Sequence, residues 1–410
     1  MYRRNISEEL YAALGDTPVV LLNGARQTGK STLAQEVAKA QSMRYVTLDD
    51  ATQLAAASSD AQGFLAGLGA RVVIDEVQKA PALFPAIKMA VDQDRRPGHF
   101  LLTGSANVLF LPQISESLAG RMELITLWPL SQGELRSQRE RFLDGAFAGH
   151  LPELQGDTAT DLKDVVLGGA YPEVVRRPPG KRREAWYSAY ISALLQRDVR
   201  DLANIEGLTE MPRLLSLLAG RVGGLLNMSE LSRSSGIPNS TLKRYLSLLQ
   251  ATFMFQPLSA WSANLGKRLI KSPKIHLIDS GLAAHLAGMN RQTLVRNPTF
   301  FGHLLETFVV SELRKQVGWV DTRVNLFHYR TTTGQEVDIL LEDAAGRVVG
   351  LEVKAAATVG KKDFTGFDAL ADSLGERFVR GIVLYTGEQV VSFSDRYVAL
   401  PVSALWRITA

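Results

Sequence analysis

The chain has 410 residues, of which 46% are hydrophobic and 21% are charged, as in ordinary globular proteins of two or three domains. It has no cysteine, which excludes disulfides, thiolate-bound zinc and thiol nucleophiles. No window approaches the roughly 18 consecutive apolar residues that a membrane span needs, and the start, MYRRNISEEL, lacks the apolar core of a secretory signal. We therefore expect a cytoplasmic protein without a membrane segment. The net charge of +4 indicates little about partners until its distribution is considered.

Residues 1–145 are expected to form an α/β domain. Short apolar strands are predicted at 18–24, 45–49, 71–76, 99–105 and 122–127, with helical stretches before or between them and a helix from about 29 to 40. Near-continuous apolar strands that alternate with helices are typical of a parallel sheet covered on both faces.

The sequence GARQTGKS begins at residue 24 and has the pattern G-x-x-x-x-G-K-[ST] between a strand and a helix. In this pattern the glycines let backbone N–H groups surround phosphate oxygens, the lysine reaches the β- and γ-phosphates, and the hydroxyl binds Mg²⁺. We therefore predict a site for ATP and Mg²⁺ with Ser31 as a metal ligand; the alternative is an ordinary glycine-rich turn. The expected nucleotide-binding residues are Gly24, Ala25, Arg26, Gln27, Thr28, Gly29, Lys30, Ser31 and Thr32.

The next two strands supply candidate catalytic groups. RVVIDE ends in Asp75, which can organise Mg²⁺, and in Glu76, which can polarise the attacking water, so hydrolysis is predicted as well as binding. LLTGSAN offers Ser105, with Thr103 second, to hold that water, although either can equally be a satisfied turn hydroxyl. Arg121 is a candidate for stabilising transition-state charge in its own site or in a neighbour's; the alternative is an exposed structural arginine. If Arg121 acts in a neighbour's site, the protein must form an oligomer, so a homo-oligomer is expected.

At this point the chain resembles a known family, the predicted AAA+ superfamily ATPases of bacteria and archaea, whose C-terminal half is an uncharacterised domain. The matching segments are LLNGARQTGKSTL, VVIDEVQKAP, LLTGSAN, LAGR, GGAYPEVV and EVDILLE…GLEVKAA, spread over nearly the whole chain. The resemblance implies an ATPase core, a winged-helix segment and a C-terminal α/β domain similar to the PD-(D/E)XK nucleases.

The middle of the chain is predicted to contain a mostly helical connector over 146–221 and a winged-helix domain over 222–290. In MSELSRSSGIPNSTLKRYLSLLQ, two helices flank a turn at Gly236, and the exposed face of the second is where major-groove readers carry their side chains.

This region is also the most basic part of the chain. Residues 221–274 hold eight Lys or Arg and a single acid, Glu230, and NLGKRLIKSPK looks like a basic β-wing able to contact phosphates. DNA contact is favoured, but winged helices also serve as protein-interaction modules. The DNA-binding candidates are Ser240, Thr241, Lys243, Arg244, Lys267, Arg268 and Lys271.

The last domain, predicted over 291–410, has a helix followed by alternating strands. Asp338 lies in one strand, whereas Glu352 and Lys354 share a face of the next, because side chains alternate along a strand. With a turn between these strands, Asp338 and Glu352 become diagonal neighbours. Two such carboxylates can bind Mg²⁺, and Lys354 can orient a water or steady negative charge.

The resemblance adds Glu306, on the preceding helix, as a further acidic residue of this possible second metal site. The pattern D-x13-E-x-K is complete, but the usual proline before the Asp is replaced by Val337. The alternative is a β-hairpin whose charged side chains are only solvated. We expect three acids of this hairpin to be solvated in either case: Glu336, Glu342 and Asp343.

The leading interpretation is a Mg²⁺-dependent ATPase that couples ATP binding and hydrolysis to DNA binding or remodelling by its C-terminal half. The first alternative is a metal-dependent DNA nuclease gated by ATP. The second is an ATP-dependent switch whose C-terminal half is a protein-interaction module.

Overall fold

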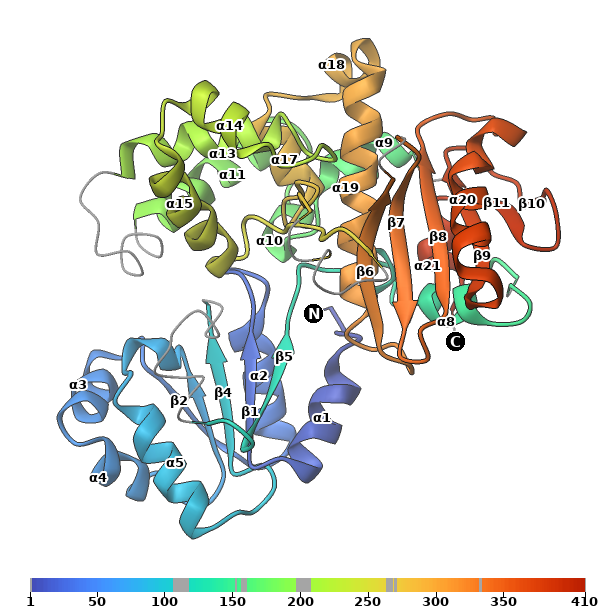
Figure 1. Ribbon diagram of the computed structural model, residues 1–410. Coiled ribbons are helices and arrows are strands. Elements are labelled where there is room, and N and C mark those ends of the chain that lie inside the picture. Colours follow the sequence, from blue (N-terminus) through green and yellow to red (C-terminus); the bar gives the residue numbers. More distant parts are fainter. Residues whose placement is uncertain are drawn as a thin grey trace.

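The computed structural model describes residues 2–105, 118–151, 153–155, 161–196, 208–262, 268, 271–331 and 334–409 (Figure 1). Its N-terminal domain holds a five-stranded sheet in the order β2-β3-β4-β1-β5, and all neighbouring pairs are parallel. The strands are β1 (Val19–Asn23), β2 (Arg44–Thr47), β3 (Val72–Asp75), β4 (Phe100–Gly104) and β5 (Met122–Thr126). The helices around them are α1 (Ser7–Asp16), α2 (Lys30–Ala40), α3 (Ala51–Ser59), α4 (Ala61–Ala66), η1 (Val77–Lys79) and α5 (Leu83–Gln93).

Both faces of this sheet are buried. Val19 and Leu21 of β1 join the apolar cluster under α3, α4 and α5, whereas Val20 and Leu22 join the cluster under α1 and α2. Successive side chains of a strand point to opposite faces, so a strand with both faces covered must be apolar throughout. The predicted parallel sheet with helices on both faces is confirmed.

The described part of the middle region is mainly helical. Its elements are α7 (Gln132–Leu135), α8 (Phe142–Phe147), α9 (Leu162–Gly168), α10 (Pro172–Val175), α11 (Lys181–Leu194), η4 (Leu208–Glu210), α13 (Met211–Ala219), α14 (Met228–Ser235), α15 (Asn239–Ala251), α17 (Ser280–Leu286) and α18 (Arg291–Arg296). Gly236 has a φ of 77° and makes the tight turn between α14 and α15. Isolated bridges from Leu225 and Leu258 to Lys274, and from Phe255 to Leu277, form a small ribbon beside these helices.

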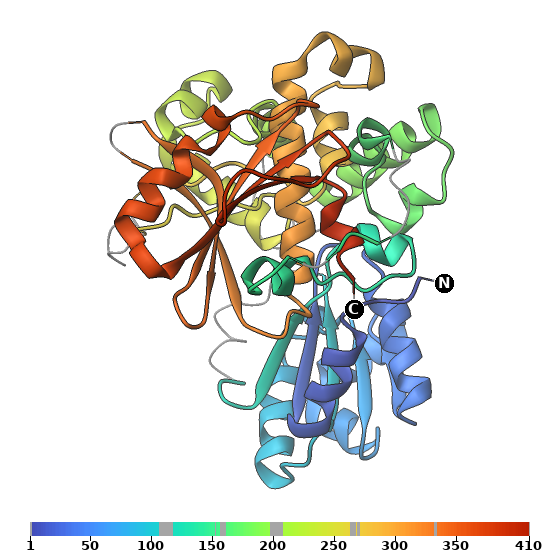
Figure 2. The same cartoon turned by 90° about the vertical axis from the view of Figure 1, so that its right-hand side faces the viewer.

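The C-terminal domain is a mixed sheet in the order β10-β11-β9-β8-β7-β6 (Figure 2). Its elements are α19 (Pro298–Gln316), β6 (Val324–Arg330), β7 (Glu336–Asp343), β8 (Val348–Lys354), η5 (Lys361–Phe364), α20 (Thr365–Leu374), η6 (Gly375–Arg377), β9 (Phe378–Tyr385), β10 (Val391–Ser392), β11 (Tyr397–Pro401) and α21 (Ala404–Arg407). The strands β6, β7 and β8 form an antiparallel meander, and β9 pairs with β8 in parallel.

The helices α19 and α20 cover opposite faces of this second sheet (Figures 1 and 2). The ring of Phe367 on α20 packs so closely on the sheet that a Cβ at Gly350 or Gly381 would lie 2.8 or 2.2 Å from it. A side chain at either strand position would therefore push the helix away. This architecture confirms the predicted α/β fold class, with a helical segment between two sheet domains.

The segment that follows β5 is bound to α19 by buried polar contacts. The Lys315 ammonium donates to the Leu130 carbonyl at 2.9 Å, and the Gln132 N–H donates to Glu312 at 2.8 Å. One apolar cluster also extends from Phe142 of α8 to Ile408 near the end of the chain. The connector and the C-terminal domain thus share a core. Within the part of the chain that the structure describes, no helix is both long and apolar enough to cross a membrane.

Candidate nucleotide site and acidic cluster

The predicted phosphate loop lies at the carboxyl end of β1 and leads into α2. Gly24 has a φ of 148°, and a Cβ there would lie 2.2 Å from the carbonyl oxygen of Leu127, so only glycine fits this turn. Gln27 and Gly29 also adopt left-handed conformations, with φ of 61° and 98°. Such left-handed conformations turn successive backbone N–H groups toward one side, as in loops that surround phosphate oxygens.

Lys30 extends its ammonium into this loop. The Nζ atom donates to the carbonyls of Gly24 at 2.9 Å and Ala25 at 2.8 Å, and the side chain is almost entirely buried. Arg4 supports the loop from behind, because its guanidinium donates to the Thr28 carbonyl at 2.8 Å. Sequence reasoning missed Arg4, since a lone arginine outside the motif carries no local signal.

Asp75 is the centre of a network of hydroxyl groups at the end of β3. It accepts hydrogen bonds from Ser31 at 3.0 Å, from Tyr45 at 2.8 Å and from Thr103. Burial and the neighbouring Asp75 carboxylate raise the pKa of Tyr45 above its ordinary value. The structure thus brings together the two predicted Mg²⁺ ligands, Ser31 and Asp75, while Tyr45 is a partner that the motif did not indicate.

Glu76 follows in a backbone conformation that is rare for a residue with a side chain, with φ of 59° and ψ of 44°. Such a conformation costs about 1–3 kcal/mol and persists only where the surroundings impose it. Here the Glu76 N–H donates to the Thr103 hydroxyl at 3.0 Å. The Gln78 amide donates to the Glu76 carboxylate and, at 3.0 Å, to the Ser105 hydroxyl. Gln78 therefore links the predicted base to the predicted water-holding serine, a role that no sequence motif indicated.

Arg121 lies at the end of the sheet opposite the phosphate loop. It directly precedes β5, and β5 runs parallel to β1 with Met122 beside Val19, so a strand of about 16 Å separates Arg121 from the phosphate-loop edge. Its guanidinium is held by Asp92 at 2.6 and 3.1 Å. Action of Arg121 in its own site is therefore wrong, because the residue is at the far end of the strand. Action in a neighbouring subunit stays a prediction.

The C-terminal carboxylates converge, as predicted, around β7 and β8. The Asp338 N–H donates to Glu352 at 3.4 Å, and the Lys354 ammonium donates to the other oxygen of Glu352 at 2.8 Å. Burial and the Asp338 carboxylate raise the pKa of Glu352 to about 7. The proposed roles of this triad in metal binding and cleavage stay predictions.

An unexpected lysine lies in the middle of these acids. The Nζ atom of Lys274 is 3.0 Å from Glu306 and 2.9 Å from Asp338, and Glu336 completes the set at 3.0 Å. Lys274 belongs to the basic segment predicted as a wing, but its side chain is only 3% exposed. Among the described residues, no group of three or more acids and histidines is arranged to hold a metal ion.

The three acids expected to be solvated are all engaged within the chain. Glu336 pairs with Lys274, Glu342 accepts from Arg268 at 2.8 Å, and Asp343 accepts from Arg347 at 2.7 Å. Glu342 and Asp343 are buried. The expectation was wrong because β7 is an inner strand: Glu336 and Glu342 meet bases of the segment before α19, and Asp343 meets Arg347 of its own hairpin.

The DNA-binding candidates are divided by the structure. Lys243, Arg244 and Ser240 are exposed on α15 as predicted, and Thr241 is half-buried. Among the wing bases, the Arg268 guanidinium is held by Glu342, and the Lys271 ammonium donates to the Arg330 carbonyl at 3.3 Å. Lys267 lies outside the described residues. The described wing bases therefore offer less free charge than their number suggested.

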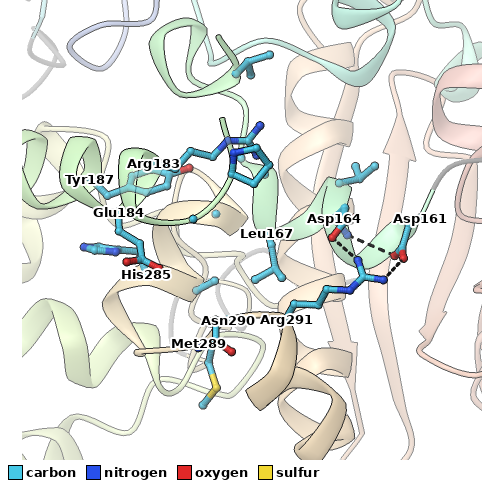
Figure 3. Close-up of a pocket in the computed structure, with 18 of the residues that line it drawn as sticks. Asp161, Asp164, Leu167, Arg183, Glu184, Tyr187, His285, Met289, Asn290 and Arg291 are labelled. Atoms are coloured by element: carbon cyan, nitrogen blue, oxygen red, sulfur yellow. Dashed lines mark hydrogen bonds and ion pairs between the residues drawn. The ribbon is translucent and has the colours of Figure 1, made fainter. Parts of the chain in front are cut away.

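A cavity of about 1230 Å³ opens between α9, α11 and α17 (Figure 3). Gly169 lines this cavity, and a Cβ there would lie 2.0 Å from the Tyr187 hydroxyl oxygen. Arg291 crosses to Asp161 and Asp164 on the opposite wall (Figure 3). The near contact with Tyr187 therefore explains Gly169 of GGAYPEVV by packing.

The fold and the phosphate loop define a P-loop protein, and comparison with known proteins agrees. Residues 16–136 match the family model described as "AAA domain". Residues 159–293 and 301–405 match models described as "Domain of unknown function", DUF8612 and DUF4143.

Two mycobacterial proteins are similar over nearly the whole chain. "Uncharacterized protein Rv2008c" of Mycobacterium tuberculosis and "Uncharacterized protein Mb2031c" of Mycobacterium bovis are each 34% identical over 405 residues, which are 97% of this chain and 83% of theirs. The chain belongs to the same family as these proteins, a family of P-loop ATPases of the AAA+ superfamily.

Solved structures give weaker likenesses. "The walker-type atpase paby2304 of pyrococcus abyssi" has a TM-score of 0.39 and 15% identity, covering 70% of this chain and 96% of that one. The RuvB Holliday junction branch migration motor of Thermotoga maritima has a TM-score of 0.31 and 18% identity, covering 62% and 88%. Both scores are low, so neither likeness adds to the family assignment.

Proposed function

We propose that the chain hydrolyses MgATP in its N-terminal domain and uses the nucleotide cycle to change how its C-terminal half engages DNA. The observation that carries the hydrolysis is the pairing of Ser31 with Asp75 at 3.0 Å, next to a constrained Glu76. A hydroxyl and a carboxylate are oxygen ligands of the kind that Mg²⁺ prefers. When bound, Mg²⁺ would neutralise charge on the phosphate oxygens.

The residues around Asp75 have separable roles in this proposal. Lys30 holds the β- and γ-phosphates, and the N–H groups of the loop surround them. Glu76 takes the proton from the attacking water. Gln78 and Ser105 fix the side chain of Glu76 and the water beside it, which lowers the entropic cost of orienting these groups in each turnover.

A continuous set of contacts supports coupling between the two halves. The phosphate loop touches the Leu127 backbone at Gly24, and the linker after β5 is bonded to Lys315 of α19 at Leu130. The same helix carries Glu306, which contacts Lys274 of the ribbon beside α15. A shift of the loop on ATP binding would therefore be transmitted to α19 and to the helix–turn–helix unit, which consists of α14, α15 and the ribbon beside them. Spatial continuity supports such coupling, and only a measured linkage demonstrates it.

DNA is proposed as the partner because of the exposed face of α15. This helix follows a tight turn after α14, and it presents Ser240, Lys243 and Arg244 to solvent. A winged-helix unit of this kind inserts its second helix into the major groove. The bases would neutralise backbone phosphates and release counterions.

We expect Lys243→Ala and Arg244→Ala each to weaken duplex binding and to reduce the slope of log K against log salt by roughly one. The measurement is a salt titration of binding by fluorescence anisotropy, over duplex, single-stranded and four-way-junction DNA. The matched control is Lys181→Ala/Arg182→Ala, which removes two exposed bases from α11 and should leave the slope unchanged.

The alternative is a protein-interaction module in the same position. It predicts no measurable binding to any of these DNAs at low salt, with or without ATP. It also predicts that α15 variants and the α11 control behave alike, and either result would replace DNA by protein as the proposed partner.

A further inference from the structure

Lys274 is the only ammonium that contacts three acids at once among the described ion pairs. It reaches Glu306 from α19 at 3.0 Å, and Glu336 and Asp338 from β7 at 3.0 and 2.9 Å. The ammonium donates hydrogen bonds to Glu306 and Asp338, and Glu336 is an ion-pair partner. Burial alone would lower the pKa of Lys274, but the three carboxylates together raise it above its ordinary value.

The backbone holds this lysine in place. The Lys274 N–H donates to the Leu258 carbonyl at 2.9 Å, and the Leu258 N–H donates back at 3.0 Å. On the other side, the Leu226 N–H donates to the Pro273 carbonyl at 2.8 Å. The side chain therefore belongs to a paired ribbon of the helix–turn–helix unit and is inserted into the C-terminal domain.

The geometry of the cluster does not fit a divalent cation. The oxygens of the three acids surround the Lys274 Nζ atom at 2.9–3.0 Å. They are therefore spaced for an ammonium, whereas Mg²⁺ requires oxygens at about 2.0–2.1 Å. The second oxygen of Asp338 accepts the Val353 N–H at 3.0 Å. A metal between these carboxylates would also have to share its space with a buried positive charge of the same sign.

We propose that Lys274 is the built-in cation of the Glu306, Glu336 and Asp338 cluster, and that a divalent metal binds there only when the ribbon withdraws this side chain. The nuclease-like site is thus latent, and the element that opens it is the helix–turn–helix unit itself. Because Leu225 and Leu258 both pair with Lys274, a rotation of that unit against β7 must move the ammonium. This inference does not depend on ATP hydrolysis in the N-terminal domain.

The test is Mn²⁺ binding to the 410-residue chain without nucleotide, counted by the electron paramagnetic resonance of free Mn²⁺. The native chain should bind no Mn²⁺ that depends on Asp338, so native and Asp338→Asn should give the same titration. Lys274→Met, which keeps the length of the side chain and removes its charge, should gain one Mn²⁺ site. Lys274→Met/Asp338→Asn should lose it again. Lys271→Met, at an exposed lysine three residues before Lys274, should gain none.

Two results would overturn the proposal. One is a Mn²⁺ site in the native chain that Asp338→Asn removes, because the cluster would then take metal with Lys274 in place. The other is a folded Lys274→Met chain that gains no site. If Lys274→Met does not fold, Lys274→Met/Glu336→Gln, which has one fewer unpaired carboxylate, is titrated in its place and judged by the same result. The comparison of the native chain with Asp338→Asn tests the first of the two results in any case.

Discussion

The Glu76→Gln chain is expected to bind ATP and to hydrolyse it about 10²- to 10⁴-fold more slowly than the native chain, since a positioned general base contributes a factor of that size. Glutamine preserves the shape and the contact with Gln78 but cannot accept the proton of water. Lys30→Ala should lower turnover by at least about 10²-fold, because a donor to the transferring phosphoryl group is lost, and it should also weaken ATP binding. Steady-state phosphate release, together with binding of a fluorescent ATP analogue, measures both.

Two exposed residues of α2 provide matched controls for these variants. Glu36→Gln and Lys39→Ala make the same chemical changes on the same domain, on side chains that face solvent. Both should hydrolyse ATP at the native rate. Equal turnover in the native, Glu76→Gln and Lys30→Ala chains would refute the assigned site.

Lys274→Met is expected to lower the free energy of unfolding by about 3–5 kcal/mol at neutral pH, the usual cost of leaving buried charges without their partner. Glu306 and Asp338 would then face each other without a cation. Burial and the Asp338 carboxylate already raise the pKa of Glu306 above its ordinary value. A carboxyl whose pKa is higher in the folded state is favoured at low pH, and that stability is lost as the pH rises through the folded pKa. The deficit of Lys274→Met should therefore shrink as the pH is lowered.

Urea unfolding followed by tryptophan fluorescence and circular dichroism measures this difference. Lys271→Met is the control, because Lys271 is exposed and bonds only weakly to the Arg330 carbonyl at 3.3 Å; its effect should stay within about 0.5 kcal/mol. A Lys274→Met chain as stable as this control would show that Lys274 does not hold the cluster.

The elements that could be predicted from sequence are those defined by local patterns. The phosphate loop was predictable because glycine spacing, Lys30 and Ser31 are contiguous and lie between a strand and a helix. Asp338 and Glu352 were predictable as neighbours because a period of two and a short turn determine which side chains meet across a hairpin.

The contacts that could not be predicted join distant parts of the chain. Lys274 could not be told from the other bases of its segment, because its acids follow 32 and more residues later. Arg4 lies outside every motif, and the motif around Gln78 indicated no role for its side chain, although each supports the nucleotide site. Arg121 was singled out as the arginine of LAGR, but only the direction of β5 shows that it lies at the end of the sheet away from the phosphate loop.

Control of DNA engagement by the nucleotide state is tested most directly by the DNA affinity of the Glu76→Gln chain in saturating ATP and in saturating ADP. This variant keeps ATP bound during the measurement, so each state is measured at equilibrium. Coupling predicts dissociation constants for the same DNA that differ by about fivefold or more. Equal constants, with both nucleotides shown to be bound, would contradict the claim.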